Sequence, residues 1–96
     1  MDLYHTSKFL ESNTFVFNDE SSIEKFENKF LMLDIETGKF FEINKTAKEI
    51  IDQIINKKSY LDMMKYFQNK YHNFNKDDLN AFLSKLLSMK IIKLND

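Results

Sequence analysis

The spacing of apolar residues changes near residue 44 of the chain. Before that point apolar residues tend to alternate with polar ones, which is typical of strands that bury one face. Residues 14–18 form a β-branched and aromatic run, and residues 30–35 and 39–43 alternate in the same way. The first half of the chain therefore predicts three strands.

The single glycine of the chain, Gly38, lies between the second and third predicted strands. A three-residue hairpin loop needs a residue in the left-handed region near its end, and glycine adopts that conformation without steric cost. We therefore expect a hairpin here. In the strand that follows, alternation places Phe41 and Ile43 on one face, with Phe40 and Glu42 on the other.

After residue 44 the apolar residues recur every three or four positions, which predicts three helices. Good capping residues stand at the expected starts: Asn44 or Thr46 for the first, Ser59 for the second and Asn75 for the third. The apolar stripes comprise Ala47, Ile50, Ile51, Ile54 and Ile55, then Tyr60, Leu61, Met64, Phe67 and Tyr71, then Leu79, Phe82, Leu83, Leu86, Leu87 and Met89. Residues 91–94 form a short apolar tail that is either a strand or packs on the core.

One segment, residues 21–29, is ambiguous, because Ser21 and Glu24 fit a capping box at the start of a short helical turn. The order is otherwise three strands, three helices and a tail. Strands segregated from helices indicate an α+β domain. The layout is that of a winged helix-turn-helix, a three-stranded antiparallel sheet followed by three helices.

The composition of the chain excludes several classes of protein and of binding site. A chain of 96 residues is one domain, and the absence of cysteine excludes a disulfide scaffold and a thiolate metal site. One glycine is too few for a phosphate-binding loop. All 14 basic residues are lysines and the net charge is −1, which argues against a non-specific nucleic-acid binder. No apolar run approaches the ~20 residues that cross a bilayer, and no signal peptide is recognisable, so we expect a cytoplasmic protein.

Candidate catalytic and metal-binding residues are few. The two histidines, His5 and His72, are far apart in sequence and have no neighbouring residues at metal-ligand spacing. Asp34 and Glu36 flank the predicted hairpin, where carboxylates face solvent. Because no nucleophile and base can be assembled from these residues, we expect neither an enzyme nor a cofactor.

The winged layout raises DNA reading as the alternative, a winged-helix transcriptional regulator. The third predicted helix opens with Asp77 and Asp78 where a recognition helix would meet phosphate, which argues against it. A structural or adaptor subunit of a larger enzyme is a third hypothesis. The wide apolar stripe of this helix indicates either burial on two sides or an apolar groove that receives a partner.

Residues 31–47 read LMLDIETGKFFEINKTA. This segment resembles the signature of the coenzyme PQQ synthesis protein D family, in which an apolar strand, an acidic turn with glycine and an aromatic pair precede a helix opened by Thr-Ala. The apolar positions downstream are similar as well. The resemblance covers residues 14–94 and leaves residues 1–13 as an N-terminal extension.

The resemblance implies a non-catalytic recognition element of ribosomally synthesised, post-translationally modified peptides. Such a domain captures the leader segment of a precursor peptide. It presents the peptide to a modifying enzyme, such as a radical SAM enzyme, a leader peptidase or a cyclase. Neither nucleic acid nor a membrane is implied as a partner.

A disordered leader can add as a strand to an exposed sheet edge, with its side chains in an adjoining groove. The predicted strand at residues 39–43 is the candidate edge, and the third helix is its neighbour across the groove. The residues expected to bind peptide are Lys39, Phe40, Phe41, Glu42 and Ile43 of the strand, and Lys76, Leu79, Asn80, Leu83 and Leu87 of the helix.

Overall fold

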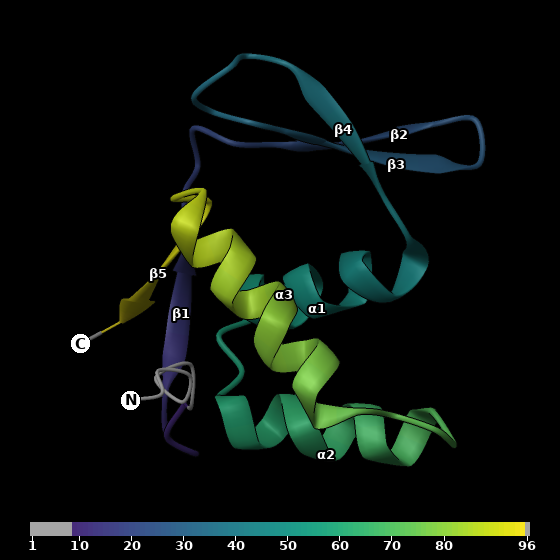
Figure 1. The fold of residues 1–96 in the computed structure, drawn as a ribbon, viewed down its shortest axis with the longest axis vertical. Helices are drawn as coiled ribbons and strands as arrows, with labels where there is room; N and C mark the ends of the chain where they lie inside the picture. Colours follow the sequence, from purple (N-terminus) through teal and green to yellow (C-terminus); the bar gives the residue numbers. More distant parts are fainter. Residues whose placement is uncertain (1–8, 96) are drawn as a thin grey trace.

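A computed structural model describes residues 9–95, and His5 lies outside them. The fold is α+β, with a three-stranded antiparallel sheet, a two-stranded ribbon and three helices (Figure 1). Its elements in chain order are β1 (Thr14–Phe17), β2 (Ile23–Phe26), β3 (Lys29–Leu33), β4 (Phe40–Ile43), α1 (Lys45–Ile55), α2 (Tyr60–Lys70), α3 (Lys76–Ser88) and β5 (Ile92–Asn95). The α+β class, the antiparallel sheet and the three helices are confirmed.

The strands of the sheet are not the three that the sequence predicts. The sheet has the order β2-β3-β4, whereas β1 pairs with β5, Phe15 facing Leu94. The expectation that all strands precede the helices is therefore wrong, because the ribbon joins the two ends of the described chain. The tail at residues 91–94 is a strand in this ribbon for most of its length.

The interpretation of residues 21–29 as the start of a short helical turn, capped by Ser21 and Glu24, is also wrong, because Glu24 lies within strand β2. Ser21 is buried, and its hydroxyl donates a hydrogen bond to the carbonyl of Leu33 at 2.7 Å. The hydroxyl is thus used to hold the start of β2 against β3. Glu27 occupies the tight turn that follows, with a φ of 57°.

The caps of the helices are largely as expected. Asn44, rather than Thr46, caps α1, accepting from the backbone N–H of Ala47 at 2.8 Å. Ser59 forms a full capping box at α2, and Asn75 caps α3. Each cap satisfies backbone donors that the first turn leaves free.

The segment just before β1, placed by sequence in an N-terminal extension, belongs to the folded unit as far as it is described. The backbone N–H groups of Tyr60 and Leu61, at the start of α2, donate to the carbonyls of Asn13 and Glu11 at 2.7 and 3.0 Å. The ring of Phe9 lies 5.5 Å from those of Phe15 and Tyr60. The segment therefore supplies acceptors to the N-terminus of α2.

The core lies between the three helices, the ribbon and the inner face of the sheet. It is formed by Phe15, Met32, Ile43, Ile50, Ile51, Ile54, Tyr60, Met63, Phe67, Leu79, Leu83, Leu86, Ile91 and Ile92. Within residues 9–95, no helix is long and apolar enough to span a bilayer.

Candidate functional site: a groove beside the edge of the sheet

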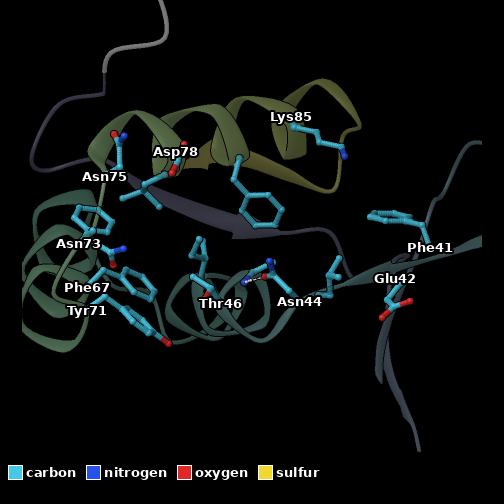
Figure 2. Close-up of a pocket in the computed structure, with 16 residues that line it drawn as sticks. Phe41, Glu42, Asn44, Thr46, Phe67, Tyr71, Asn73, Asn75, Asp78 and Lys85 are labelled. Atoms are coloured by element: carbon cyan, nitrogen blue, oxygen red, sulfur yellow. Dashed lines mark hydrogen bonds between the residues drawn. The ribbon is translucent and has the colours of Figure 1, made fainter. Parts of the chain in front are cut away.

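A groove of about 550 Å³ lies between strand β4 and helix α3 (Figure 2). The N-terminal turns of α1 form its floor, and the end of α2 with the following loop closes it at the far end from β4. The groove is lined by Phe41, Glu42, Ile43, Asn44, Thr46, Ala47, Ile50, Phe67, Tyr71, Asn73, Phe74, Asn75, Asp78, Leu79, Phe82 and Lys85. These residues come from four elements and the connections between them.

Strand β4 is an edge strand, since β3 is its one strand partner in the described chain. The N–H of Asp34 donates to the carbonyl of Lys39 at 2.8 Å, so these residues form a hydrogen-bonded pair. In an antiparallel ladder such pairs alternate along the strand. With Met32 opposite Phe41, the backbone groups of Phe41 therefore face β3, and those of Phe40 and Glu42 face outward.

The side chains of β4 alternate between the two faces of the sheet. Ile43 is buried and Phe41 half-buried on the inner face, next to the groove. Phe40 is 49% exposed on the outer face, and the Glu42 carboxylate lies 4.0 Å from Lys29 there. Figure 2 shows Glu42 pointing away from α3. The groove therefore meets β4 at the inner side of its unpaired edge.

Helix α3 turns one side toward the groove, through residues at i, i+4 and i+7 spacing: Asp78, Phe82 and Lys85. Phe82 is half-buried, whereas Asp78 and Lys85 are exposed. The ammonium of Lys85 lies 5.8 Å from the centre of the Phe41 ring, within reach of a cation–π contact. The helix and the strand are thus linked across one end of the groove.

The far end of the groove is aromatic. The rings of Tyr71 and Phe74 lie nearly parallel to that of Phe67, each at a centroid distance of 6.1 Å. Phe67 is fully buried, and its two neighbours are half-buried. Near-parallel rings at this distance pack favourably and hold one another in place. These three packed rings form the wall of the groove at this end.

A charged cluster beside the groove fixes Tyr71. Its hydroxyl donates to one oxygen of Glu49 at 2.7 Å, and Lys70 donates to the other at 2.5 Å. Burial raises the pKa of Glu49, but the hydrogen bonds from Lys70 and Tyr71 outweigh burial and leave that pKa below its ordinary value. The hydrogen bond to Glu49 raises the pKa of both Lys70 and Tyr71.

The sequence-predicted binding residues divide among several places. Phe41, Glu42, Ile43 and Leu79 line the groove. Lys39, just before β4, and Phe40, the first residue of β4, are both exposed and do not line the groove. Of the five residues predicted for the strand, the three that line the groove are therefore the last three of β4.

The other four predicted helix positions lie outside the groove. Leu83 is 0% exposed, and its assignment to the groove is wrong because the core already covers it on every side. Lys76 and Asn80 line a separate hollow of about 370 Å³ beside Tyr60, whose hydroxyl donates to Asn80 at 2.5 Å. Leu87 lines a hollow beside the β1-β5 ribbon.

Sequence reasoning missed the polar and small residues of the groove. Thr46 stood out only as a possible helix cap, Ala47 only as an apolar residue at the start of the first helix, and Asp78 only as a carboxylate that argues against DNA binding. Phe82 and Lys85 lie three residues apart and share a helix face, which was the available signal. To use that signal, one would have to know which side of the wide apolar stripe of α3 turns toward the sheet.

Within residues 9–95, no three His, Asp or Glu side chains are close enough together to hold a metal ion. Comparison with protein-family models, curated proteins and solved structures finds no match to this chain. The groove combines an unpaired strand edge, a mainly apolar floor and one charged group at each end of the α3 face.

Proposed function

We propose that this protein binds an extended peptide segment, which adds as a further strand to the outer edge of β4 and places alternate side chains in the groove. One observation carries the proposal. The outward backbone groups of Phe40 and Glu42 stand beside a groove of about 550 Å³ with an apolar floor. An unpaired edge supplies hydrogen bonds, and pockets for alternate side chains supply specificity.

The resemblance to the coenzyme PQQ synthesis protein D family supports a particular peptide: the leader segment of a ribosomally synthesised precursor. In this proposal the protein is not an enzyme. It acts in the cytoplasm and presents the precursor to a modifying enzyme, which is a radical SAM enzyme, a leader peptidase or a cyclase. The sheet and helices α2 and α3 then correspond to a winged helix-turn-helix used for peptide rather than for DNA.

The charges of α3 favour peptide over DNA. Its first turn carries Asp77 and Asp78, both exposed, and the described chain offers no arginine there for base edges. Carboxylates at that position repel phosphate, whereas peptide backbone pairing needs no positive surface.

The test is a proline at the outward-facing position of β4. Peptides of twelve residues are first selected on the wild-type protein from a random display library, and their affinities are then measured by fluorescence anisotropy. Glu42→Pro removes an outward backbone donor but keeps the ladder to β3. Loss of one backbone hydrogen bond, about 1 kcal/mol, together with the bulk of the ring predicts binding five- to tenfold weaker or worse.

Two control variants separate the edge from other effects. Glu42→Ala removes the same side chain but keeps the N–H, so it should bind as the wild type does. Lys25→Pro places proline on β2, the opposite edge, where the donation from Leu33 N–H to the Ser22 carbonyl likewise leaves the N–H of Lys25 facing outward. Equal affinity of Glu42→Pro and the wild type, or equal losses in both proline variants, would refute strand addition at β4.

A further inference from the structure

The groove carries its charges in a fixed order along α3. Lys85 stands at the end nearest β4, over the ring of Phe41. Asp78 lies toward the other end, on the side of Asn73 and Asn75 (Figure 2). The two charged residues are seven positions apart in the helix, about 10 Å along its axis.

The lining between these charges is mainly apolar, with Thr46 of α1 as a polar exception. Phe82 comes between Asp78 and Lys85 on the same face of α3, and Ala47, Ile50 and Leu79 also line the groove, the last two at 6% and 1% exposure. A charged ligand side chain placed here would lose water without gaining a partner, whereas an apolar one would gain from burial. The middle of the groove therefore selects an apolar residue.

The remaining carboxylate of the lining does not disturb this order. Glu42 points away from α3 toward the outer face, where Lys29 is its neighbour. Among the lining residues of the described chain, Lys85 supplies the one positive charge. From the end near β4, the α3 side of the groove therefore presents a basic, an aromatic and an acidic side chain in turn.

We infer that the peptide bound here carries an acidic, an apolar and a basic residue at alternate positions, the acidic one beside Lys85 and the basic one beside Asp78. This inference rests on the proposed strand addition. Side chains on one face of a strand recur every second residue, at about 3.3 Å per residue, so the three positions span about 13 Å. Asp78 and Lys85 are about 10 Å apart along α3. The long side chains of Lys85 and of the basic ligand residue are flexible enough to cover the difference between this distance and the span of the peptide.

The experiment is a selection on a charge-exchanged variant. The twelve-residue random display library is selected in parallel on the wild type and on Asp78→Lys/Lys85→Glu, which has the same net charge. The wild type should enrich peptides with an acidic and a basic residue four positions apart around an apolar residue, in one chain order. The exchanged variant should enrich the opposite order.

A control exchange, Asp77→Lys/Lys93→Glu, changes the same residue types at exposed positions outside the groove lining. It should enrich the wild-type order. The neutral variant Asp78→Asn/Lys85→Gln serves if the exchanged protein does not fold, as judged by circular dichroism. It should keep the apolar preference and lose the enrichment of both charges at least fivefold.

The outcomes separate this inference from the proposed function. Enrichment of apolar peptides with no charge order, or the same order on wild type and exchanged variant, overturns the inference and leaves strand addition standing. If the neutral variant keeps the charge pattern of the wild type, the inference also fails. Absence of any enriched peptide on the wild-type protein refutes peptide binding itself.

Discussion

The ammonium of Lys85 lies 5.8 Å from the centre of the Phe41 ring, so one contact joins α3 to β4 across the mouth of the groove. The two residues are far apart in the chain, and Phe41 also packs against the hydrophobic core. Because Lys85 is exposed and Phe41 half-buried, the contact lies between the core and solvent. It links the position of the strand edge to that of the helix.

A double-mutant cycle measures this contact. Lys85→Met keeps the length of the side chain and removes its charge, and Phe41→Leu removes the aromatic face. Cation–π contacts at exposed sites contribute about 0.5–1 kcal/mol, so we expect a coupling of that size in urea unfolding. A coupling indistinguishable from zero would show that the two side chains are merely neighbours.

Adjacent positions of α3 should behave differently. Leu83 is fully buried, so Leu83→Ala should lower the free energy of unfolding by about 3 kcal/mol. Phe82 is half-buried in the groove wall, so Phe82→Ala should lower it by only about 1 kcal/mol. Peptide affinity, measured by anisotropy on folded protein, should fall for Phe82→Ala and stay unchanged for Leu83→Ala. The reverse pattern of affinities would place the groove on the wrong side of the helix.

This pair also shows where the sequence stops being informative. Periodicity predicts that α3 is apolar on a wide face, and it locates the caps at Ser59 and Asn75, because these signals are local. Which part of the face meets the core and which meets the groove depends on how the helix is rotated against the sheet. That rotation is set by packing between distant segments, so sequence reasoning placed Leu83 in the groove, whereas Phe82 lines it.

The pairing of strands is likewise a long-range property. Thr14 and Asn95 are opposite one another in the β1-β5 ribbon, although they lie at the two ends of the described chain. No local pattern specifies such a pair. Strand β2 escaped prediction for a different reason: three of its four residues are exposed, so it lacks the alternation that marks a half-buried strand. By contrast, Gly38 was predictable because its turn is a local requirement.

Backbone strain gives a test of that turn. Gly38 has a φ of 72°, and a Cβ there would meet nothing within 4 Å. Gly38→Ala should therefore cost only the conformational penalty, about 1 kcal/mol. Lys57, just after α1, has a φ of 63°, so Lys57→Gly should raise stability by up to about 1 kcal/mol. Thermal and urea unfolding of both variants check the opposite signs, and a neutral Gly38→Ala would contradict the left-handed conformation.

The cluster around Glu49 predicts an acid-sensitive contribution to stability. Its pKa in the folded protein lies below the ordinary value of 4.5, because hydrogen bonds from Lys70 and Tyr71 outweigh burial. The folded state therefore binds the proton less well than the unfolded state, and the contribution is present above pH 4.5 and lost as the pH falls through the lowered pKa. Urea unfolding of wild type and Glu49→Gln should differ most near neutral pH and converge as the pH falls below 4.5. A difference that does not change with pH would exclude this linkage.

The floor of the groove offers the most direct way to block it without touching the strand edge. Ala47 is half-buried on the first turns of α1, beneath the space that opens between β4 and α3. Ala47→Phe places a ring in that space, so bound side chains lose their site while the outward backbone groups of β4 stay free. We expect peptide affinity to fall at least tenfold and the helical circular dichroism to be kept. Ala47→Ser, a change of similar size to the native residue, should bind as the wild type does. If Ala47→Phe binds selected peptides with unchanged affinity, the side chains of the ligand do not enter the groove and strand pairing alone would have to account for binding.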